Sequence, residues 1–299
     1  MNNIYKLFLI SLILSFMVFG CNMSNNNSGN AEFDVDTSDF QYQEQSHKVK
    51  KIFYNVPSPI EMAAIMQRAG ASYDFGLLNR VENVDKYTTN STMALNLGVY
   101  GADLSYTRMF DQIQESVNFL SVIRKLSDGL GIPQEPGRFA VSRIEKNIEN
   151  RDSLLLIITD VYGAADIYLK ENNRGSTATL IILGGWVEAL YIATNIINEN
   201  KKNTEVLERI AEQKYSLQNL IELLNSYEGD EIIALYLPTL NELDEIYKAV
   251  EITSSKTEVK TDSIKKITSI DNKSEIKITM KEVQVIREKV SLLREKIIK

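Results

Sequence analysis

Cysteine and histidine are nearly absent from this sequence, whose 299 residues include one Cys and one His. A catalytic triad with a histidine base, a thiolate zinc site, a two-histidine iron centre and a histidine-ligated haem all need residues that the chain lacks. A helical di-iron carboxylate centre is excluded as well, because its paired motifs each contain a histidine. We therefore expect no metal and no cofactor.

Basic charge is also scarce: 33 Lys and Arg stand against 40 Asp and Glu, and the formal net charge is −7. Domains that bind nucleic acid normally present a basic face, so we expect no nucleic-acid partner. The chain has only 14 Gly and 5 Pro, and 44% of its residues are hydrophobic. This composition is typical of a globular chain and excludes a disordered or fibrous one.

One long apolar run lies close to the start of the chain. Residues 7–20 are apolar over 14 positions and follow the single charge of Lys6. At 1.5 Å per residue this run spans about 21 Å as a helix, which is less than the roughly 30 Å of a bilayer core. Its length and flanks predict the apolar region of a secretory signal peptide over residues 1–20.

The run ends in Val18-Phe19-Gly20-Cys21. This stretch resembles the lipobox of bacterial lipoproteins, in which a small residue directly precedes the cysteine. The resemblance implies cleavage after Gly20 and acylation of Cys21 with chains such as palmitate, which would anchor the protein stably in a membrane of the cell envelope. Asn22, rather than Asp, after the cysteine resembles some Gram-negative lipoproteins and implies the outer membrane, facing the periplasm or the cell surface. The alternative is an ordinary secretory signal beside an incidental cysteine.

The rest of the chain divides by composition. Residues 21–51 are polar and begin rich in Asn and Ser, which predicts a flexible tether. Residues 52–250 carry helical apolar periodicity, and residues 251–274 are rich in Lys, Thr and Ser, which predicts a polar linker or a weakly packed arm. Residues 275–299 form an amphipathic helix, whose apolar stripe either packs on the other helices or pairs with a protein partner.

Apolar residues recur at steps of three and four through most of residues 52–250, and the connections between these segments are short and polar. Short links favour antiparallel neighbours, so the predicted fold is an all-α, multi-helix bundle. The periodicity runs without a break from residue 90 to Gly129, and Pro238 is expected to break or kink its helix. The expected helices cover residues 58–69, 90–129, 138–150, 153–172, 177–200, 204–227, 231–237 and 239–250.

Residues 177–197 are the most apolar part of the body and contain Glu188 as their one charge. Such a segment is either a membrane span or the central helix of a bundle, and we favour the central helix because acylation already supplies a membrane anchor. Gly184 and Gly185 within it are expected to allow close approach of a neighbouring helix, and Gly98 and Gly101 are interpreted in the same way.

Four acidic residues lie among apolar neighbours, each within helical reach of a tyrosine. A buried carboxylate must be paired, hydrogen-bonded or protonated, so these residues predict a buried polar network. Its candidate members are Asp103, Asp160, Asp166, Glu188, Tyr100, Tyr106, Tyr162 and Tyr191. The network either fixes the register of the helices, with Arg108 or Arg143 as a further partner, or lines a polar pocket with raised carboxylate pKa values.

The sequence thus favours a membrane-anchored envelope lipoprotein with a helical binding or structural role and no identifiable catalytic apparatus. One alternative is a carboxylate-based hydrolase of envelope glycans, which needs two carboxyl groups about 5–5.5 Å or 6.5–9.5 Å apart beside an open cleft. Another is a small-ligand carrier, which needs a cavity between the helices.

Overall fold

The computed structural model describes residues 70–133, 144, 146–150, 167–197, 204–254, 258–262, 267–271 and 274–299. By contacts the chain divides into residues 1–40 and 41–299, and every described residue belongs to the second unit. The expected signal peptide, tether and helix at 58–69 lie outside the described residues. So does most of the two helices expected at 138–150 and 153–172.

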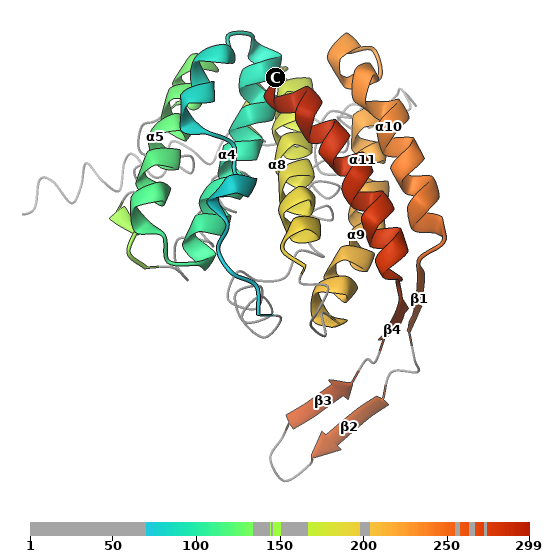
Figure 1. The fold of residues 1–299 in the computed structure, drawn as a ribbon. Coiled ribbons are helices and arrows are strands. Elements are labelled where there is room, and N and C mark those ends of the chain that lie inside the picture. The colour runs from blue at the N-terminus through green and yellow to red at the C-terminus, as the bar shows by residue number, and fades with distance from the viewer. Residues whose placement is uncertain are drawn as a thin grey trace, which may run out of the picture. The chain divides into compact units, whose positions relative to one another are not determined.

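The described part is a multi-helix bundle, as the apolar periodicity predicts (Figure 1). Two short 3-10 helices, η1 (Phe75–Leu77) and η2 (Val81–Lys86), precede the first long helix. The long helices are α4 (Asn90–Met109), α5 (Ile113–Gly129), α8 (Gly175–Asn195), α9 (Thr204–Asn225), α10 (Glu231–Lys248) and α11 (Met280–Ile298).

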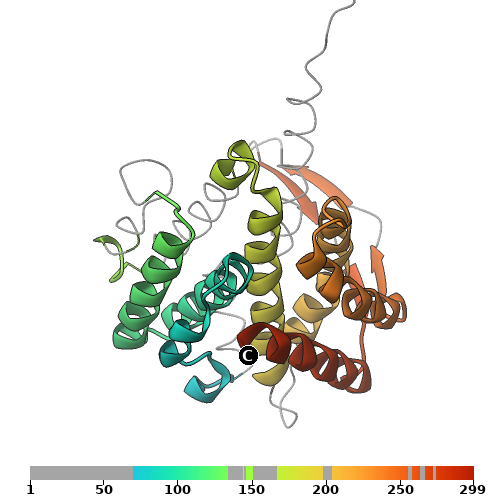
Figure 2. The ribbon, with the colours of Figure 1, turned by 90° about the horizontal axis from the view of Figure 1, so that it is seen from above.

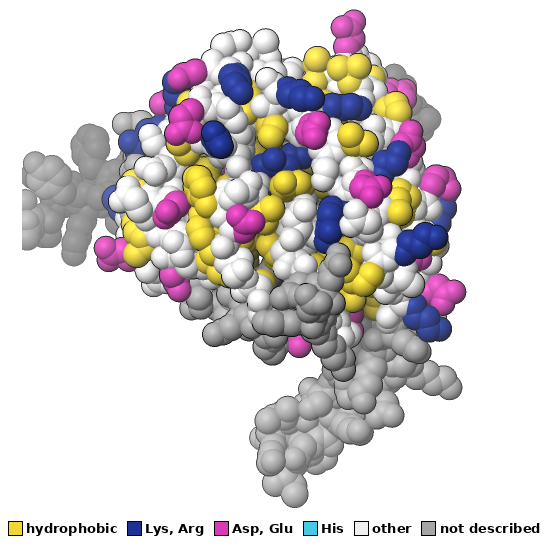
Figure 3. Space-filling model, in the orientation of Figure 1, with side chains coloured by type: hydrophobic (Ala, Val, Ile, Leu, Met, Phe, Trp, Pro, Cys, Tyr) yellow, Lys and Arg dark blue, Asp and Glu magenta, His cyan; other side chains and the backbone are white. Residues whose placement is uncertain are grey.

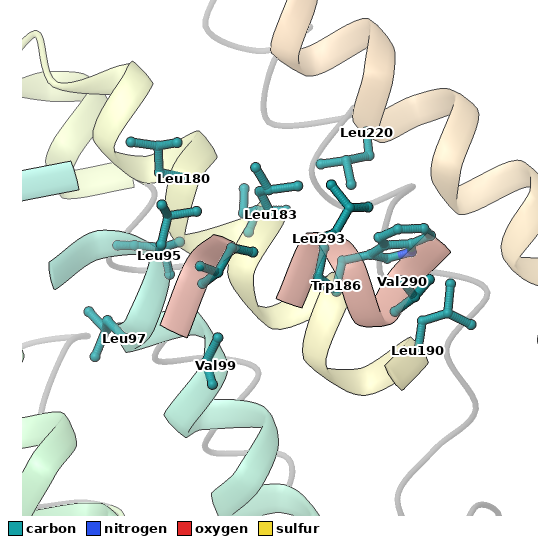
Figure 4. Close-up of a cluster of buried hydrophobic side chains, with 14 of the residues drawn as sticks. Leu95, Leu97, Val99, Leu180, Leu183, Trp186, Leu190, Leu220, Val290 and Leu293 are labelled. Atoms are coloured by element: carbon teal, nitrogen blue, oxygen red, sulfur yellow. The ribbon is translucent and has the colours of Figure 1, made fainter. Parts of the chain in front are cut away.

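Helix α8 is the central element of the bundle. Figure 2 shows it between α4, which α5 flanks, and the α9–α10 pair, while α11 lies across α8 and α10. By length and composition α8 alone among the described helices is apolar enough to cross a membrane, yet 72% of its apolar window is buried inside the bundle. The structure therefore gives it the role of a core helix. Figure 4 shows how Leu183 and Trp186 of α8 lie among apolar side chains from α4, α9 and α11.

Helices α4 and α8 cross with their backbones in close contact, as the glycines predict. A Cβ atom at Gly98 would overlap the carbonyl oxygen of Ile181, and one at Gly184 would overlap the carbonyl oxygen of Leu95. Only glycine permits this approach, which offsets its unfavourable helix propensity of about 1 kcal/mol.

The uninterrupted helix expected from residue 90 to Gly129 is wrong, because the chain turns at residues 110–112. Asp111 adopts a left-handed conformation with φ 55°, and the amide of Gln112 donates to the carbonyl of Thr107 over 2.9 Å. This arrangement is a Schellman-type helix end, usually built on glycine but open to Asp. The periodicity continues across it because α4 and α5 face one core.

Of the two effects expected at Pro238, a break or a kink, the break is wrong, since α10 runs through the proline from Glu231 to Lys248. Ala234 and Pro238 are both exposed, so the backbone hydrogen bond that proline removes is lost at the surface of the bundle. Leu240 and Leu243, just after the proline, are fully buried. Their packing outweighs the local preference to stop.

The segment between α10 and α11 has a form that composition did not predict. This segment, expected to be a polar linker or a weakly packed arm, contains β1 (Glu251–Ser254) paired antiparallel with β4 (Ser274–Lys277) and β2 (Glu258–Asp262) paired antiparallel with β3 (Ile267–Asp271). Ile252 pairs with Ile276, and both pack against the core. The apolar stripe of α11 then packs on α4, α8 and α10, which is the first of its two expected roles.

Candidate functional site

Two of the predicted buried carboxylates meet inside the bundle. Asp103 of α4 and Glu188 of α8 are both 0% exposed, and each carboxyl group affects the pKa of the other. The close backbone contact of α4 with α8 at Gly98 and Gly184 brings these side chains within reach of each other. We call Asp103 and Glu188 the acid pair.

Arg294 of α11 balances the charge of the acid pair. Its Nε donates to Oε2 of Glu188 over 2.6 Å and its Nη2 donates to Oε1 over 2.8 Å, so the guanidinium binds both carboxylate oxygens. Such a two-point contact is the strongest geometry available to an arginine and a carboxylate. Nη2 also donates to the carbonyl of Leu77 over 2.8 Å, and the ring of Tyr191 lies 4.2 Å from the guanidinium carbon.

The surroundings of Asp103 favour a proton on its carboxyl group. Oδ2 of Asp103 accepts the amide of Asn79 over 3.2 Å, whereas the buried Oδ1 has no hydrogen-bond partner among the described residues. Both oxygens of Glu188 already accept from Arg294. A protonated Asp103 can donate to Glu188, whereas an ionised Asp103 places a second negative charge in the buried site without a cation of its own.

The electrostatic surroundings agree with this assignment. Burial raises the pKa of Asp103 well above its usual value, the negative charge of Glu188 raises it further, and Arg294 and the amide of Asn79 oppose the rise. Burial also raises the pKa of Glu188, against the opposing effect of Arg294. With Asp103 protonated, the site holds one carboxylate and one guanidinium and has no net charge.

The predicted tyrosines take other partners. Tyr100 donates its hydroxyl to the carbonyl of Arg80 over 2.8 Å, and the hydroxyl of Tyr106 accepts the amide of Asp74 over 3.0 Å. Both therefore hold the segment before α4 rather than bonding to Asp103. Tyr191 follows Glu188 by one helical turn, but it interacts through its ring with Arg294.

Sequence reasoning named Arg108 or Arg143 as the cationic partner and missed Arg294. Arg143 lies outside the described residues, and Arg108 contacts Asp111 at 3.9 Å instead of the acid pair. A signal was present: Arg294 lies four residues after Val290 and three before Ile297, on the apolar stripe of its own helix. A charged residue on a buried stripe requires a buried partner.

Two further polar contacts, also missed, hold the end of α11. Asn96 of α4 donates its side-chain amide to the carbonyl of Ile297 over 2.9 Å, and Tyr87 donates its hydroxyl to the carbonyl of Ile298 over 3.1 Å. The last carbonyls of a helix lack partners within the helix, so these donors satisfy groups that packing alone would bury unpaired.

The remaining candidates, Asp160, Tyr162 and Asp166, lie outside the described residues, as does Cys21. Within the described ranges, no group of His, Cys, Asp and Glu side chains is arranged to hold a metal ion. The acid pair does not suit glycoside hydrolysis. Its carboxyl groups are both 0% exposed, whereas that reaction needs two carboxyl groups that reach a substrate in an open cleft.

What the arrangement does instead is join elements that are distant in the sequence. Through Arg294, Glu188 and Asp103 it ties α11 to α8 and α4, and the Asn79 and Leu77 contacts add the segment before α4.

Comparison of the chain with models of known protein families, with curated proteins and with solved structures finds no match in any of the three.

Proposed function

We propose that this protein is a bacterial lipoprotein of the cell envelope, whose helical bundle serves a structural or binding role while acylated Cys21 holds it at a membrane. The observation that carries the proposal is the position of Cys21, the chain's only cysteine, immediately after a small residue and a 14-residue apolar run. A lone cysteine at that place suits acylation better than a disulfide.

The described part of the bundle supports a structural or binding role for the body. Three of its buried charged groups, Asp103, Glu188 and Arg294, lie at one site and join helices. The most apolar helix, α8, is largely buried by its neighbours, so membrane attachment falls to the acyl chains rather than to a span. On the face that Figure 3 shows, acidic and basic side chains are interspersed with apolar ones.

Mass spectrometry of the protein purified from its native membrane tests the proposal. We expect a mature chain that begins at Cys21, with a lipid on its sulfur and an acyl chain on its amino group. Growth with labelled palmitate should label the wild-type protein but not a Cys21→Ala variant. Recovery of a chain that still begins at Met1, or that carries a free thiol at Cys21, would overturn the proposal.

A further inference from the structure

Helix α11 differs from the other two helices of the acid pair site in how it is held. α4 and α8 are locked by backbone contact at their glycines. α11 is held at the acid pair through the side chain of Arg294, and it is joined to α10 through the strand pairs β1–β4 and β2–β3. Asn96 and Tyr87 add side-chain hydrogen bonds to its last turn. Separation of α11 from the acid pair therefore breaks side-chain contacts, but it breaks neither a helix nor the α4–α8 backbone contact.

The closed site tolerates only one negative charge. With Asp103 protonated, the buried groups are one carboxylate and one guanidinium, which pair completely. Removal of the proton leaves two fully buried carboxylates and one cation, Arg294, that is largely buried. A buried unbalanced charge strongly disfavours the arrangement that encloses it. Departure of α11 would admit water to both carboxylates.

We propose that the proton on Asp103 latches α11 onto α4 and α8, and that loss of this proton as the pH rises releases α11 from the bundle. Release uncovers the apolar stripe of α11, in which Val283, Ile286 and Val290 are fully buried in the closed state. The latch is thus a pH-dependent switch that controls access to an amphipathic helix and to the surface beneath it.

The direction of the pH dependence follows from the charge states. In the released state Asp103 meets water and regains an ordinary pKa of about 3.9, whereas the closed site raises it. The closed state is therefore at its most stable, relative to the released state, below about pH 4. Its opening constant rises roughly tenfold per pH unit until the raised pKa of the closed state is reached.

The neighbours of Asp103 do not reverse this direction. Among the described residues, the titratable groups that interact with it are Glu188 from α8, Arg294 from α11, Tyr100 from α4 and Tyr73 from the segment before η1. The pKa values of both tyrosines are raised by burial, so they stay neutral. Burial raises the pKa of Glu188 too, so its ionisation also destabilises the closed state as the pH rises.

Hydrogen exchange of the full-length chain in detergent, read by mass spectrometry at pH 5, 7 and 9, tests the latch. Exchange in α11 is compared between wild type and Asp103→Asn after correction for intrinsic rates. The Asn side chain can still donate to Glu188 and accept from Asn79, but it cannot ionise. We expect wild-type protection of α11 to fall as pH rises, at up to about tenfold per unit, and the variant to remain protected.

Helix α5 and a surface variant provide the controls. α5 does not belong to the acid pair, so its protection should stay constant while α11 opens. Asp85→Asn removes an equal charge from an exposed carboxylate that pairs with Lys125, and it should behave as wild type.

The fluorescence emission of Trp186, the only tryptophan, gives a second measurement of α11 release. This residue shares a buried cluster with Val290 and Leu293 of α11 (Figure 4).

Three results would overturn the latch. The first is wild-type protection of α11 that does not change from pH 5 to pH 9. The second is the same pH dependence in Asp103→Asn as in wild type. The third is loss of protection in α5 together with α11, which would mean that ionisation unfolds the bundle as a whole.

Discussion

Arg294 is the residue through which α11 contacts the acid pair, and its binding to Glu188 leads to a clear prediction. Glu188→Gln should leave a buried guanidinium without a counter-ion. Removing one partner of a buried ion pair lowers the free energy of unfolding by about 3–5 kcal/mol, and we expect a loss of this size. Urea unfolding at pH 7, followed by Trp186 fluorescence, measures it.

The double variant Glu188→Gln, Arg294→Met provides the control for this loss. It removes both charges while keeping side chains of similar length, so it should be more stable than Glu188→Gln alone. The difference between the summed single losses and the double loss gives the coupling energy of the pair. A coupling energy near zero would contradict the contact between Arg294 and Glu188.

At the scale of single residues, the sequence predicts the two acids of the site but not the arginine that binds Glu188. Asp103 and Glu188 can be recognised because an acid among apolar neighbours in a helical pattern must be buried, and burial demands a partner. The partner itself lies 106 residues from Glu188, and no local pattern encodes that distance. Tyr100 and Tyr106 mislead for the same reason: helical spacing places them near Asp103, but their hydroxyls reach another segment.

The crossing of α4 with α8 depends on glycine, and this is testable at the scale of the element. Gly98→Ala should force the helices apart, because its Cβ would overlap the carbonyl oxygen of Ile181. Overpacking of this kind destabilises by about 1–3 kcal/mol or more, and the strain should also weaken the acid pair. Thermal unfolding followed by circular dichroism measures the change.

Gly185→Ala is the matched control, since it lies in the same crossing but its Cβ would meet its nearest neighbour at an ordinary 3.4 Å. There the gain in helix propensity, up to about 1 kcal/mol, should dominate and leave the bundle unchanged or more stable. Equal destabilisation by the two variants would show that the backbones do not approach as described.

Replacement of Pro238 is predicted to raise the stability of the bundle. Replacement by Ala restores an amide that can donate to the carbonyl of Ala234 within α10, and it removes the steric conflict with the preceding turn. The side chain is exposed, so no packing is lost. We expect Pro238→Ala to stabilise the protein by roughly 1–3 kcal/mol in urea unfolding. A loss of stability would mean that Pro238 itself stabilises the folded state.

Pro238 and Asp111 also show where prediction of the elements fails. Existence and type of the long helices follow from apolar periodicity, but their ends depend on competition between local preference and tertiary packing. Packing carries α10 through a proline, and an Asp in a left-handed conformation ends α4 where no glycine marks the end. The strands at residues 251–277 carry little apolar alternation, so composition alone indicates a linker.

For the whole molecule, the all-α bundle is the part of the fold that the sequence predicts best. Its core includes α8, whose composition alone also fits a membrane span. The choice between the two interpretations depends on the neighbouring helices, which bury most of its apolar surface. Membrane attachment and folding of the bundle should therefore be separable properties of this chain.

This separation is the last prediction. If Cys21 carries the proposed acyl anchor, Cys21→Ala should move the protein from the membrane fraction to the soluble fraction, because the variant has no site for acylation and α8 remains enclosed by the bundle. The released chain should keep the helical circular dichroism signal and the unfolding midpoint of the wild type, since position 21 lies outside the described bundle. Retention of the variant in the membrane after alkaline extraction would contradict the anchor at Cys21 and would favour α8 as a span.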